Sequence, residues 1–305
     1  MRLPQLGWTP AQIPDLTGRT ALVTGANSGL GLHTSLELAR HGARVLMACR
    51  SAAKGQQALQ QVRAAAAGAP PEVVALDLAS LASVRDAAED VATRTGALDV
   101  LVDNAGIMAV PRSLTVDGFE SQLGTNHLGH FALTGRVLPL LLAAPAPRVV
   151  VVSSTAHRSG RIRFDDLMGE RSYSRWGAYG QSKLANLLFA RELSQRAQGR
   201  LLVASAHPGY AATNLQTGQQ SPLLEAAMKV GNLVVAQSDA QGAWPSLYAA
   251  TMPDVQPDDY FGPALFELRG SPKRVGRAPA AQDGAAAHLL WEESARLTGV
   301  SYNGL

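Results

Sequence analysis

Tyr179 and Lys183 are the residues of this sequence whose spacing points most directly to acid–base chemistry. They stand four positions apart, ahead of an apolar run at 184–193 that is typical of a helix. Residues at i and i+4 share one helical face, so a phenol and an ammonium are expected side by side. A free phenol loses its proton near pH ~10, and a nearby cation lowers that pKa. The pair is therefore predicted to act as a general acid/base.

Tyr-x-x-x-Lys also arises by chance on helix surfaces, so the prediction depends on the elements that position the pair. Short apolar runs alternate with longer helical patterns along the chain. Strands are expected at 20–24, 44–49, 72–77, 98–103, 148–153 and 200–206, and helices at about 30–41, 51–66, 80–95, 118–142 and 178–197. This alternation predicts crossover units and a parallel sheet with helices on both faces.

Three segments depart from the alternation. Residues 1–17 carry three prolines and are expected to form a surface extension. Residues 155–177 and 210–237 each follow an expected strand. Ligands of open α/β sheets bind beyond the carboxyl ends of the strands, so both segments are expected to wall a substrate site. The apolar positions of 210–237 fit ordinary core packing equally well.

A glycine-rich stretch joins the first expected strand to the first expected helix. Its residues Gly25, Asn27, Ser28, Gly29, Leu30 and Gly31 carry the spacing G-x-x-x-G-x-G. Glycines at such a turn let a phosphate approach free N–H groups at a helix N-terminus. The stretch therefore predicts a dinucleotide-binding turn, although its spacing differs from the more common G-x-G-x-x-G.

Arg50 ends the second expected strand, about 20 residues beyond the glycines. An acidic residue there would bind ribose hydroxyls, whereas an arginine suits a 2′-phosphate. We therefore expect NADP, with NAD as the alternative and with Asn27 and Lys54 assisting Arg50. Asp77, followed by Leu78, is expected either to accept from the adenine amino group or to lie at the N-cap region of the next helix.

Composition and charge exclude several classes of protein. Among 305 residues, 46% are hydrophobic and 17% charged, which fits a globular protein. The formal net charge of +3 does not indicate nucleic-acid binding, and the arginines at 158–163 and basic residues at 273–277 are interpreted as solvated surface rather than an anion site. With no signal peptide and no apolar run of 18 residues, we expect a cytoplasmic protein without an integral membrane segment.

The single cysteine and the histidines are interpreted as structural. Cys49 lies in an apolar run and excludes an intramolecular disulfide. His127 and His130 lack a third ligand at suitable spacing, so no metal site is expected. His157 and His207 flank the proposed site, where structural hydrogen bonding is the default interpretation and substrate contact the alternative.

Six motifs in order resemble the short-chain dehydrogenase/reductase family over roughly residues 17–270. They are the glycine stretch from Thr24, Asp103-Asn104-Ala105-Gly106, Asn126, Ser153-Ser154, Tyr179 with Lys183, and His207-Pro208-Gly209 with Thr213. Within the family, Ala48 to Ser51, Asn126 to Phe131, Ser153 to His157 and Ser182 to Asn186 are similar to the retinol-dehydrogenase-like and protochlorophyllide-reductase-like branch.

The resemblance implies a single Rossmann-type doubly wound α/β domain over 1–305, with a mostly parallel seven-stranded sheet. It implies that Ser154, twenty-five residues before Tyr179, is catalytic, with Ser153 as the alternative. Lys183 would lower the Tyr179 pKa, and Asn126 would hold a water that resupplies the proton. The remaining cofactor contacts that it implies are Asn104, Ala105, Gly106, Pro208, Gly209 and Thr213.

The substrate is expected to be a small-molecule hydrophobic carbonyl or alcohol, retinoid-, steroid- or lipid-like. Phe164, Tyr173, Trp176 and Tyr210 are expected at the mouth of the site. The apolar face at 184–193 is compatible with a homodimer or homotetramer, and a core role explains it equally well. The alternative to an NADP-dependent oxidoreductase is a non-catalytic NADP-binding sensor or scaffold.

Overall fold

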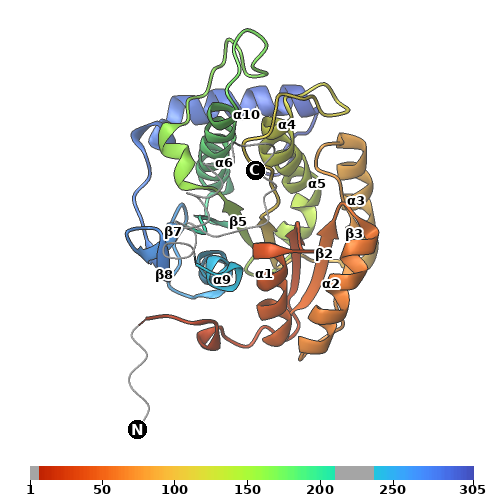
Figure 1. Cartoon of the computed structure of the whole chain (residues 1–305). Coiled ribbons are helices and arrows are strands. Elements are labelled where there is room, and N and C mark those ends of the chain that lie inside the picture. Colours follow the sequence, from red (N-terminus) through yellow and green to blue (C-terminus); the bar gives the residue numbers. More distant parts are fainter. Residues whose placement is uncertain (1–6, 210–236) are drawn as a thin grey trace, which may run out of the picture.

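The computed structural model describes residues 7–209 and 237–305, which fold around one eight-stranded sheet (Figure 1). The strand order is β3-β2-β1-β4-β5-β6-β7-β8. The order reverses between β1 (Thr20–Thr24) and β4 (Val100–Asp103), which pair in parallel. The point of reversal in such a sheet is where its ligand sites form.

The central strands form because their residues are apolar on both faces. In β1 all five residues are buried. Leu22 belongs to one hydrophobic core and its neighbours Ala21 and Val23 to another, as the two-residue period of a strand requires. Two cores therefore lie on opposite faces of one sheet, and each is closed by its own set of helices.

Each face of the sheet has its own helices (Figure 1). The helices on one side are α1 (Gly29–Arg40), α2 (Ala52–Ala65) and α9 (Trp244–Thr251). Those on the other side are α3 (Leu81–Arg94), α5 (Gly129–Ala143), α6 (Arg175–Ala197) and α10 (Gly284–Thr298). The remaining strands are β2 (Arg44–Cys49), β3 (Glu72–Ala75), β5 (Arg148–Val152), β6 (Leu202–Ala206), β7 (Tyr260–Leu265) and β8 (Arg269–Arg274).

The predicted fold class is confirmed: a Rossmann-like α/β domain with a mostly parallel sheet. The expected count of seven strands is wrong by one. The eighth strand, β8, runs antiparallel to β7 at the sheet edge and contains Pro272. Proline lacks the N–H that a central strand needs, and an edge strand tolerates it. A short helix, α8 (Asp239–Gly242), precedes α9.

The helix expected at 118–142 is divided into three parts. α4 (Ser121–Leu123) leads into a π-helical turn, η2 (Gly124–Leu128), and then into α5. The Gly129 N–H bonds the Gly124 carbonyl five residues back, which defines the wider turn. Such turns recur at functional sites, and this one contains Asn126.

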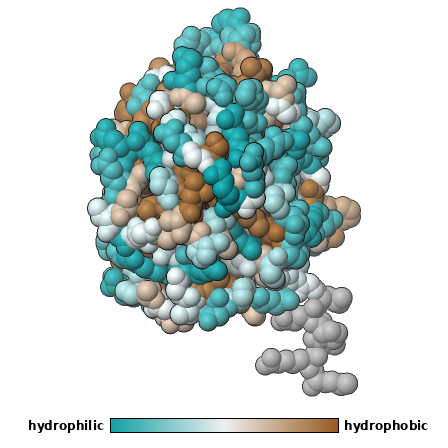
Figure 2. Space-filling view, turned by 180° about the vertical axis from the view of Figure 1, so that it is seen from behind, coloured by the Kyte–Doolittle hydropathy of each residue, from teal (hydrophilic) through white to brown (hydrophobic). Residues whose placement is uncertain are grey.

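The first described residues pack against the helices of one face of the sheet, where Trp8, Ile13 and Leu16 are buried in the hydrophobic core. Trp8 makes edge-on contacts with Trp244 and Tyr248 of α9. On the face of the molecule seen in Figure 2, hydrophobic side chains form small areas among hydrophilic ones. Among the described helices, none combines the length and the hydrophobicity required to cross a bilayer.

Candidate functional site

Tyr179 and Lys183 lie on the second and third turns of α6, and Lys183 reaches the carboxyl end of β5. The Lys183 Nζ is 5.9 Å from the centre of the Tyr179 ring. Both side chains are almost buried, at 7% and 4% exposure. The predicted juxtaposition is therefore present, because the i, i+4 spacing places both residues against the sheet.

The expected effect of Lys183 on the phenol does not hold for the protein alone. Burial raises the pKa of Tyr179, and only the Ser154 hydroxyl, which bonds the phenol, opposes the rise. The sequence showed the neighbouring cation but not the loss of solvent, which here outweighs it. Tyr179 is therefore held in its protonated form at neutral pH.

Lys183 is a buried cation held by a neutral partner. Its Nζ donates to the Val152 carbonyl at 3.1 Å, and within the described chain it forms no ion pair. Burial lowers its pKa from 10.5 to about 8. The Lys183 amine is therefore mostly protonated at pH 7, and its pKa is close enough to neutral pH for the proton to exchange.

The two serines after β5 have different surroundings. The Ser153 hydroxyl donates to the Lys183 carbonyl at 2.7 Å, so its hydrogen is committed to the α6 backbone. The Ser154 oxygen accepts from the Ala156 N–H at 3.2 Å, and its side chain contacts the Tyr179 phenol. The geometry therefore favours Ser154 as the serine able to bond a substrate oxygen.

Asn126 is fixed in the π-helical turn by bonds to the loop after β4. Its Oδ1 accepts from the Ile107 N–H at 2.8 Å, and its Nδ2 donates to the Ile107 carbonyl and the Ser182 hydroxyl, both at 2.9 Å. A Cβ on Gly106 would lie 3.0 Å from the Asn126 Oδ1 and 3.4 Å from the Lys183 Nζ. Asn126 and Lys183 thus converge on Gly106.

The glycine stretch forms a turn that fits a dinucleotide phosphate. Gly25 and Gly29 have φ of +67° and +54°, in the left-handed region that favours glycine. A Cβ on Gly31 would lie 2.4 Å from the Gly25 carbonyl oxygen, so a side chain there would close the turn. Ser28 is the N-cap of α1 without a side-chain capping bond, which leaves the first N–H groups of the helix available to an anion.

The turn is joined to the loop that follows β4. The Asn104 Nδ2 donates to the Thr24 carbonyl at 2.8 Å, and the Asn104 and Ala105 N–H groups both donate to the Thr24 hydroxyl at 2.9 Å. Asn27 and Leu30 lie partly exposed in the same turn. Asn104, Ala105 and Gly106 therefore connect the glycine turn to the Asn126–Lys183 pair.

Arg50 and Lys54 are exposed at the carboxyl end of β2, and within the described chain neither forms an ion pair. Asp77 bonds the Ala79 N–H with Oδ1 at 3.0 Å, in the turn before α3, whose N-cap is Ser80. Asp77 thus takes part in the turn before the helix. Leu78 is buried beside it.

Pro208 and Gly209 follow β6 at the same edge of the sheet. Gly209 has φ of +69°, and a Cβ there would lie 2.4 Å from the Leu268 carbonyl oxygen. The Gln237 side chain bonds the Pro208 carbonyl. Thr213, Tyr210 and most of the expected wall at 210–237 lie outside the described residues.

The segment 155–177 lies beside Tyr179 and brings aromatic residues to it. Trp176 is 53% exposed and meets the Tyr179 ring edge-on at 6.0 Å. Tyr173, expected at the mouth, is partly buried and donates its hydroxyl to the Val110 carbonyl at 3.0 Å. Phe164 is 41% exposed.

Sequence reasoning missed Gln122, which holds this segment in place. It is fully buried, accepts from the Ala109 N–H at 2.7 Å and donates to the Tyr173 hydroxyl at 2.9 Å. A glutamine within an expected helix gives no sequence signal for such a role. Gln122 joins the loop after β4 to residue 173 and so shapes the substrate side.

His157 and His207 have structural partners. The His157 Nδ1 donates to the Ser154 carbonyl at 2.6 Å, and its Nε2 accepts from the Ala278 N–H at 3.1 Å. The His207 Nδ1 accepts from the Gly209 N–H at 3.1 Å. Among the described residues, no group of three or more His, Cys, Asp and Glu side chains is arranged to hold a metal ion.

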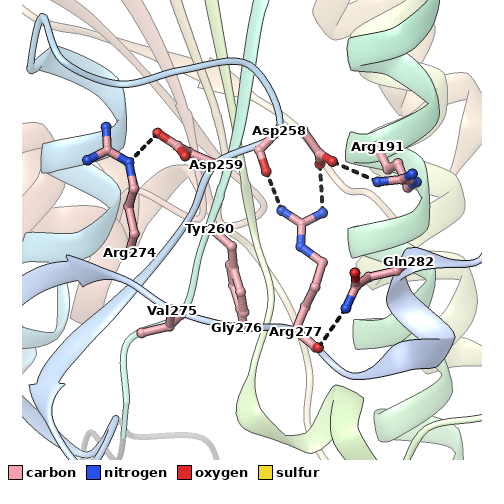
Figure 3. Close-up of a pocket in the computed structure, with 9 residues that line it drawn as sticks. All are labelled: Arg191, Asp258, Asp259, Tyr260, Arg274, Val275, Gly276, Arg277 and Gln282. Carbon is pink, nitrogen blue, oxygen red and sulfur yellow. Dashed lines mark hydrogen bonds and ion pairs between the residues drawn. The ribbon is translucent and has the colours of Figure 1, made fainter.

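A pocket lies beside Arg191, farther along α6 than Lys183 (Figure 3). Its charges neutralise one another: Asp258 bonds Arg191 at 3.0 Å and Arg277 at 2.6 Å, and Asp259 bonds Arg274 at 2.9 Å. Arg158 likewise pairs with Glu267 outside this pocket. Arg158 and Arg274 are exposed, as expected of solvated surface, but the Arg277 side chain is only 8% exposed, so that interpretation is wrong for Arg277. Because Asp258 bonds both Arg191 and Arg277, it ties the chain after β8 to α6.

Comparisons with known proteins agree with this geometry. A family model described as short chain dehydrogenase matches residues 19–223. Mouse retinol dehydrogenase 14 is 42% identical over 93% of this chain and 86% of its own length, and mouse retinol dehydrogenase 12 is 40% identical over 96% and 90%.

Solved structures give the same result. An uncharacterized protein from Mycobacterium paratuberculosis is 46% identical over 97% of this chain and 99% of its own, with a TM-score of 0.81. A protein from Beutenbergia cavernae, described as an NAD(P) dependent gluconate 5-dehydrogenase and solved with NADP bound, is 26% identical over 78% and 91%, with a TM-score of 0.62.

Proposed function

The chain belongs to the short-chain dehydrogenase family, in its retinol-dehydrogenase-like branch, and on that premise we propose an NADP(H)-dependent oxidoreductase of bulky hydrophobic carbonyls or alcohols. The observation that carries the proposal is the convergence of Ser154, Tyr179, Lys183 and Asn126 beside the glycine turn. A retinoid is the substrate we favour, because the relatives that are about 40% identical over nearly the whole chain carry that name.

The preference for NADP(H) rests on Arg50. It is an exposed cation without a protein partner in the described chain, where a 2′-phosphate would be bound. The glycine turn fits the rest of the cofactor, because a Cβ on Gly31 would fill its cradle. When bound, the nicotinamide supplies or accepts the hydride.

The protein's side chains transfer the proton to the substrate oxygen and stabilise the negative charge that develops on it. In the direction of reduction, Tyr179 gives its proton to the substrate oxygen, a role for which its raised pKa keeps it protonated. The Ser154 hydroxyl bonds the same oxygen. Lys183, with its pKa lowered to about 8, exchanges protons readily at neutral pH and returns one toward Tyr179.

Turnover of reduced NADPH with all-trans-retinal, long-chain aldehydes and steroid ketones tests the proposal. We expect oxidation of NADPH by at least one of these, faster than oxidation of NADH, and its loss in Tyr179→Phe with unchanged NADPH affinity. The reverse reaction is followed with retinol and NADP⁺. NADPH binding without turnover in either direction would contradict the proposal and favour a cofactor sensor.

A further inference from the structure

His130 occupies a position between the glycine turn and the catalytic residues. It lies one turn beyond Asn126, at the start of α5, and is 1% exposed. Its Nδ1 is 2.9 Å from the backbone carbonyl oxygen of Asn126, and its Nε2 is 2.9 Å from the hydroxyl of Thr24. One imidazole therefore joins two residues that are 102 positions apart in the sequence.

The partners of His130 define its protonation. A carbonyl oxygen only accepts, so the Nδ1 must carry the hydrogen, and a neutral imidazole then has a free lone pair on Nε2. The Thr24 hydroxyl accepts from the N–H groups of Asn104 and Ala105, and its own hydrogen can go to the His130 Nε2 at 2.9 Å or to the Val102 carbonyl at 3.3 Å. The shorter distance favours the donation to His130. Every polar atom in this chain of bonds has a partner.

A charged His130 would lose this arrangement. A proton on Nε2 would face a hydroxyl oxygen that already accepts two N–H bonds. Burial lowers the pKa of His130 to about 4; the bond to the Asn126 carbonyl opposes this shift, and repulsion from the Lys183 ammonium adds to it. The imidazole is therefore neutral, with a single tautomer, at the pH where the reaction runs.

The bonds continue from Asn126 to the catalytic helix. The Asn126 Nδ2 donates to the Ser182 hydroxyl, which donates to the Tyr179 carbonyl at 2.8 Å. These hydrogen bonds run from Thr24 through His130 and Asn126 to α6, and His130 is the link between the glycine turn and the π-helical turn.

Building on the proposed function, we propose that His130 is a positioning residue, which aligns the Asn126 carbonyl for proton resupply and ties it to Thr24 of the cofactor turn. It touches neither hydride nor substrate and acts through Asn126. The Asn126 side chain and the Lys183 Nζ both approach Gly106, so the π-helical turn that His130 fixes lies beside the ammonium proposed to return the proton.

Two substitutions separate the two bonds of the ring. In His130→Asn, the amide nitrogen falls near the position of Nδ1 and keeps the bond to Asn126. In His130→Gln, the amide reaches the position of Nε2, keeping the contact with Thr24 but losing the bond to Asn126. His288→Gln is the matched control, because His288 lies on the exposed face of α10.

We expect His130→Gln to lower kcat about tenfold, the effect of one net hydrogen bond, without changing NADPH affinity. Its solvent deuterium isotope effect on kcat should rise, because proton resupply becomes more limiting. His130→Asn should recover most of the lost rate. Equal losses in both variants, with isotope effects like those of the parent, would show a merely structural role and overturn the proposal.

A substrate-free measurement keeps this inference separate from the proposed function. Hydrogen exchange over residues 124–130 should accelerate in His130→Gln and stay near the parent rate in His130→Asn. Nitrogen NMR should show an imidazole protonated on Nδ1 from pH 6 to 8. Unchanged exchange in His130→Gln, or an Nε2-protonated tautomer, would overturn the proposal even in a protein for which no substrate had been found.

Discussion

Replacing Lys183 with methionine should stabilise the folded protein at neutral pH, although it removes a group that the proposed reaction uses. Lys183 is 4% exposed, and its hydrogen-bond partner among residues 7–209 and 237–305 is the neutral Val152 carbonyl. Val152 keeps a second donor, the Asn186 Nδ2 at 3.0 Å, so the substitution leaves no orphaned acceptor. Methionine fills a similar volume without a charge that must be buried.

The lowered pKa gives the size of the effect. The pKa falls from 10.5 to about 8, a difference of about 2.5 units, or roughly 3 kcal/mol of unfolding free energy at pH 7. The lost hydrogen bond offsets about 1 kcal/mol. We therefore expect Lys183→Met to raise the free energy of unfolding by about 2 kcal/mol.

The pH dependence has a definite sign. Between pH 8 and 10.5 the unfolded chain holds a proton on Lys183 that the folded chain has released, so the stability of the parent rises with pH in this interval. The advantage of Lys183→Met is therefore full below pH 8 and disappears by about pH 10.5. Other titrating groups are common to both proteins and cancel in the difference.

Urea unfolding of both proteins between pH 7 and 10.5 measures this difference. Lys54→Met is the control, because Lys54 is exposed and its replacement should change stability little. If Lys183→Met were less stable than the parent at pH 7, or its advantage did not vary with pH, the argument from burial would be refuted.

Three further predictions concern Arg50, the glycine turn and the buried Asp103. Arg50→Ala should weaken NADPH binding about tenfold and NADH binding little, measured by fluorescence titration; equal losses would contradict the 2′-phosphate assignment. Gly31→Ala should abolish NADPH binding, because the new Cβ would lie 2.4 Å from the Gly25 oxygen, whereas Gly96→Ala meets no atom within 4 Å and should bind normally in the same titration. Asp103 is fully buried and its pKa is raised to about 8, so the free energy of unfolding of the parent should fall as the pH rises from 4 to 8. Urea unfolding should show Asp103→Asn becoming more stable relative to the parent over that interval. A constant difference between the two proteins would count against the raised pKa.

The central strands were predictable because their chemistry is local. Residues 20–24 and 44–49 were predicted as strands and appear with those bounds, since a strand buried on both faces must be apolar throughout. β8 was missed because Arg269–Arg274 is polar and contains a proline, and nothing in it predicts a strand. It forms because the chain turns back onto β7, a tertiary cause that a short sequence window does not contain.

The site was predictable where a single side chain carries the chemistry. Tyr179, Lys183, Ser154 and Asn126 have the spacing of a known pattern, and the structure brings them together. The rise in the Tyr179 pKa was not predictable, because spacing shows a neighbouring charge and does not show how much solvent is lost.

The supporting residues had no signal in the sequence. Gln122 bonds the Ala109 N–H and the Tyr173 hydroxyl, two groups 64 residues apart in the chain. Thr24 was noticed only as part of a motif, and His130 as part of a motif and as a candidate metal ligand without a third partner. Their role depends on which atoms face each other across β1 and α5, and only the folded structure brings these elements into contact.

The pairing of β1 with β4 has a consequence for how the protein folds. Leu22 pairs with Leu101, and two strands and three helices lie between them in the sequence. Forming this pairing therefore closes a long loop of the chain. Contacts so distant in sequence are slow to form, because the chain loses the entropy of loop closure before the contacts begin to stabilise it. The glycine turn and Asn104 meet across this pairing, and the nucleotide-binding surface is therefore a late product of folding. A bound nucleotide selects the completed sheet by mass action, which makes cofactor supply during expression a means of recovering destabilised variants.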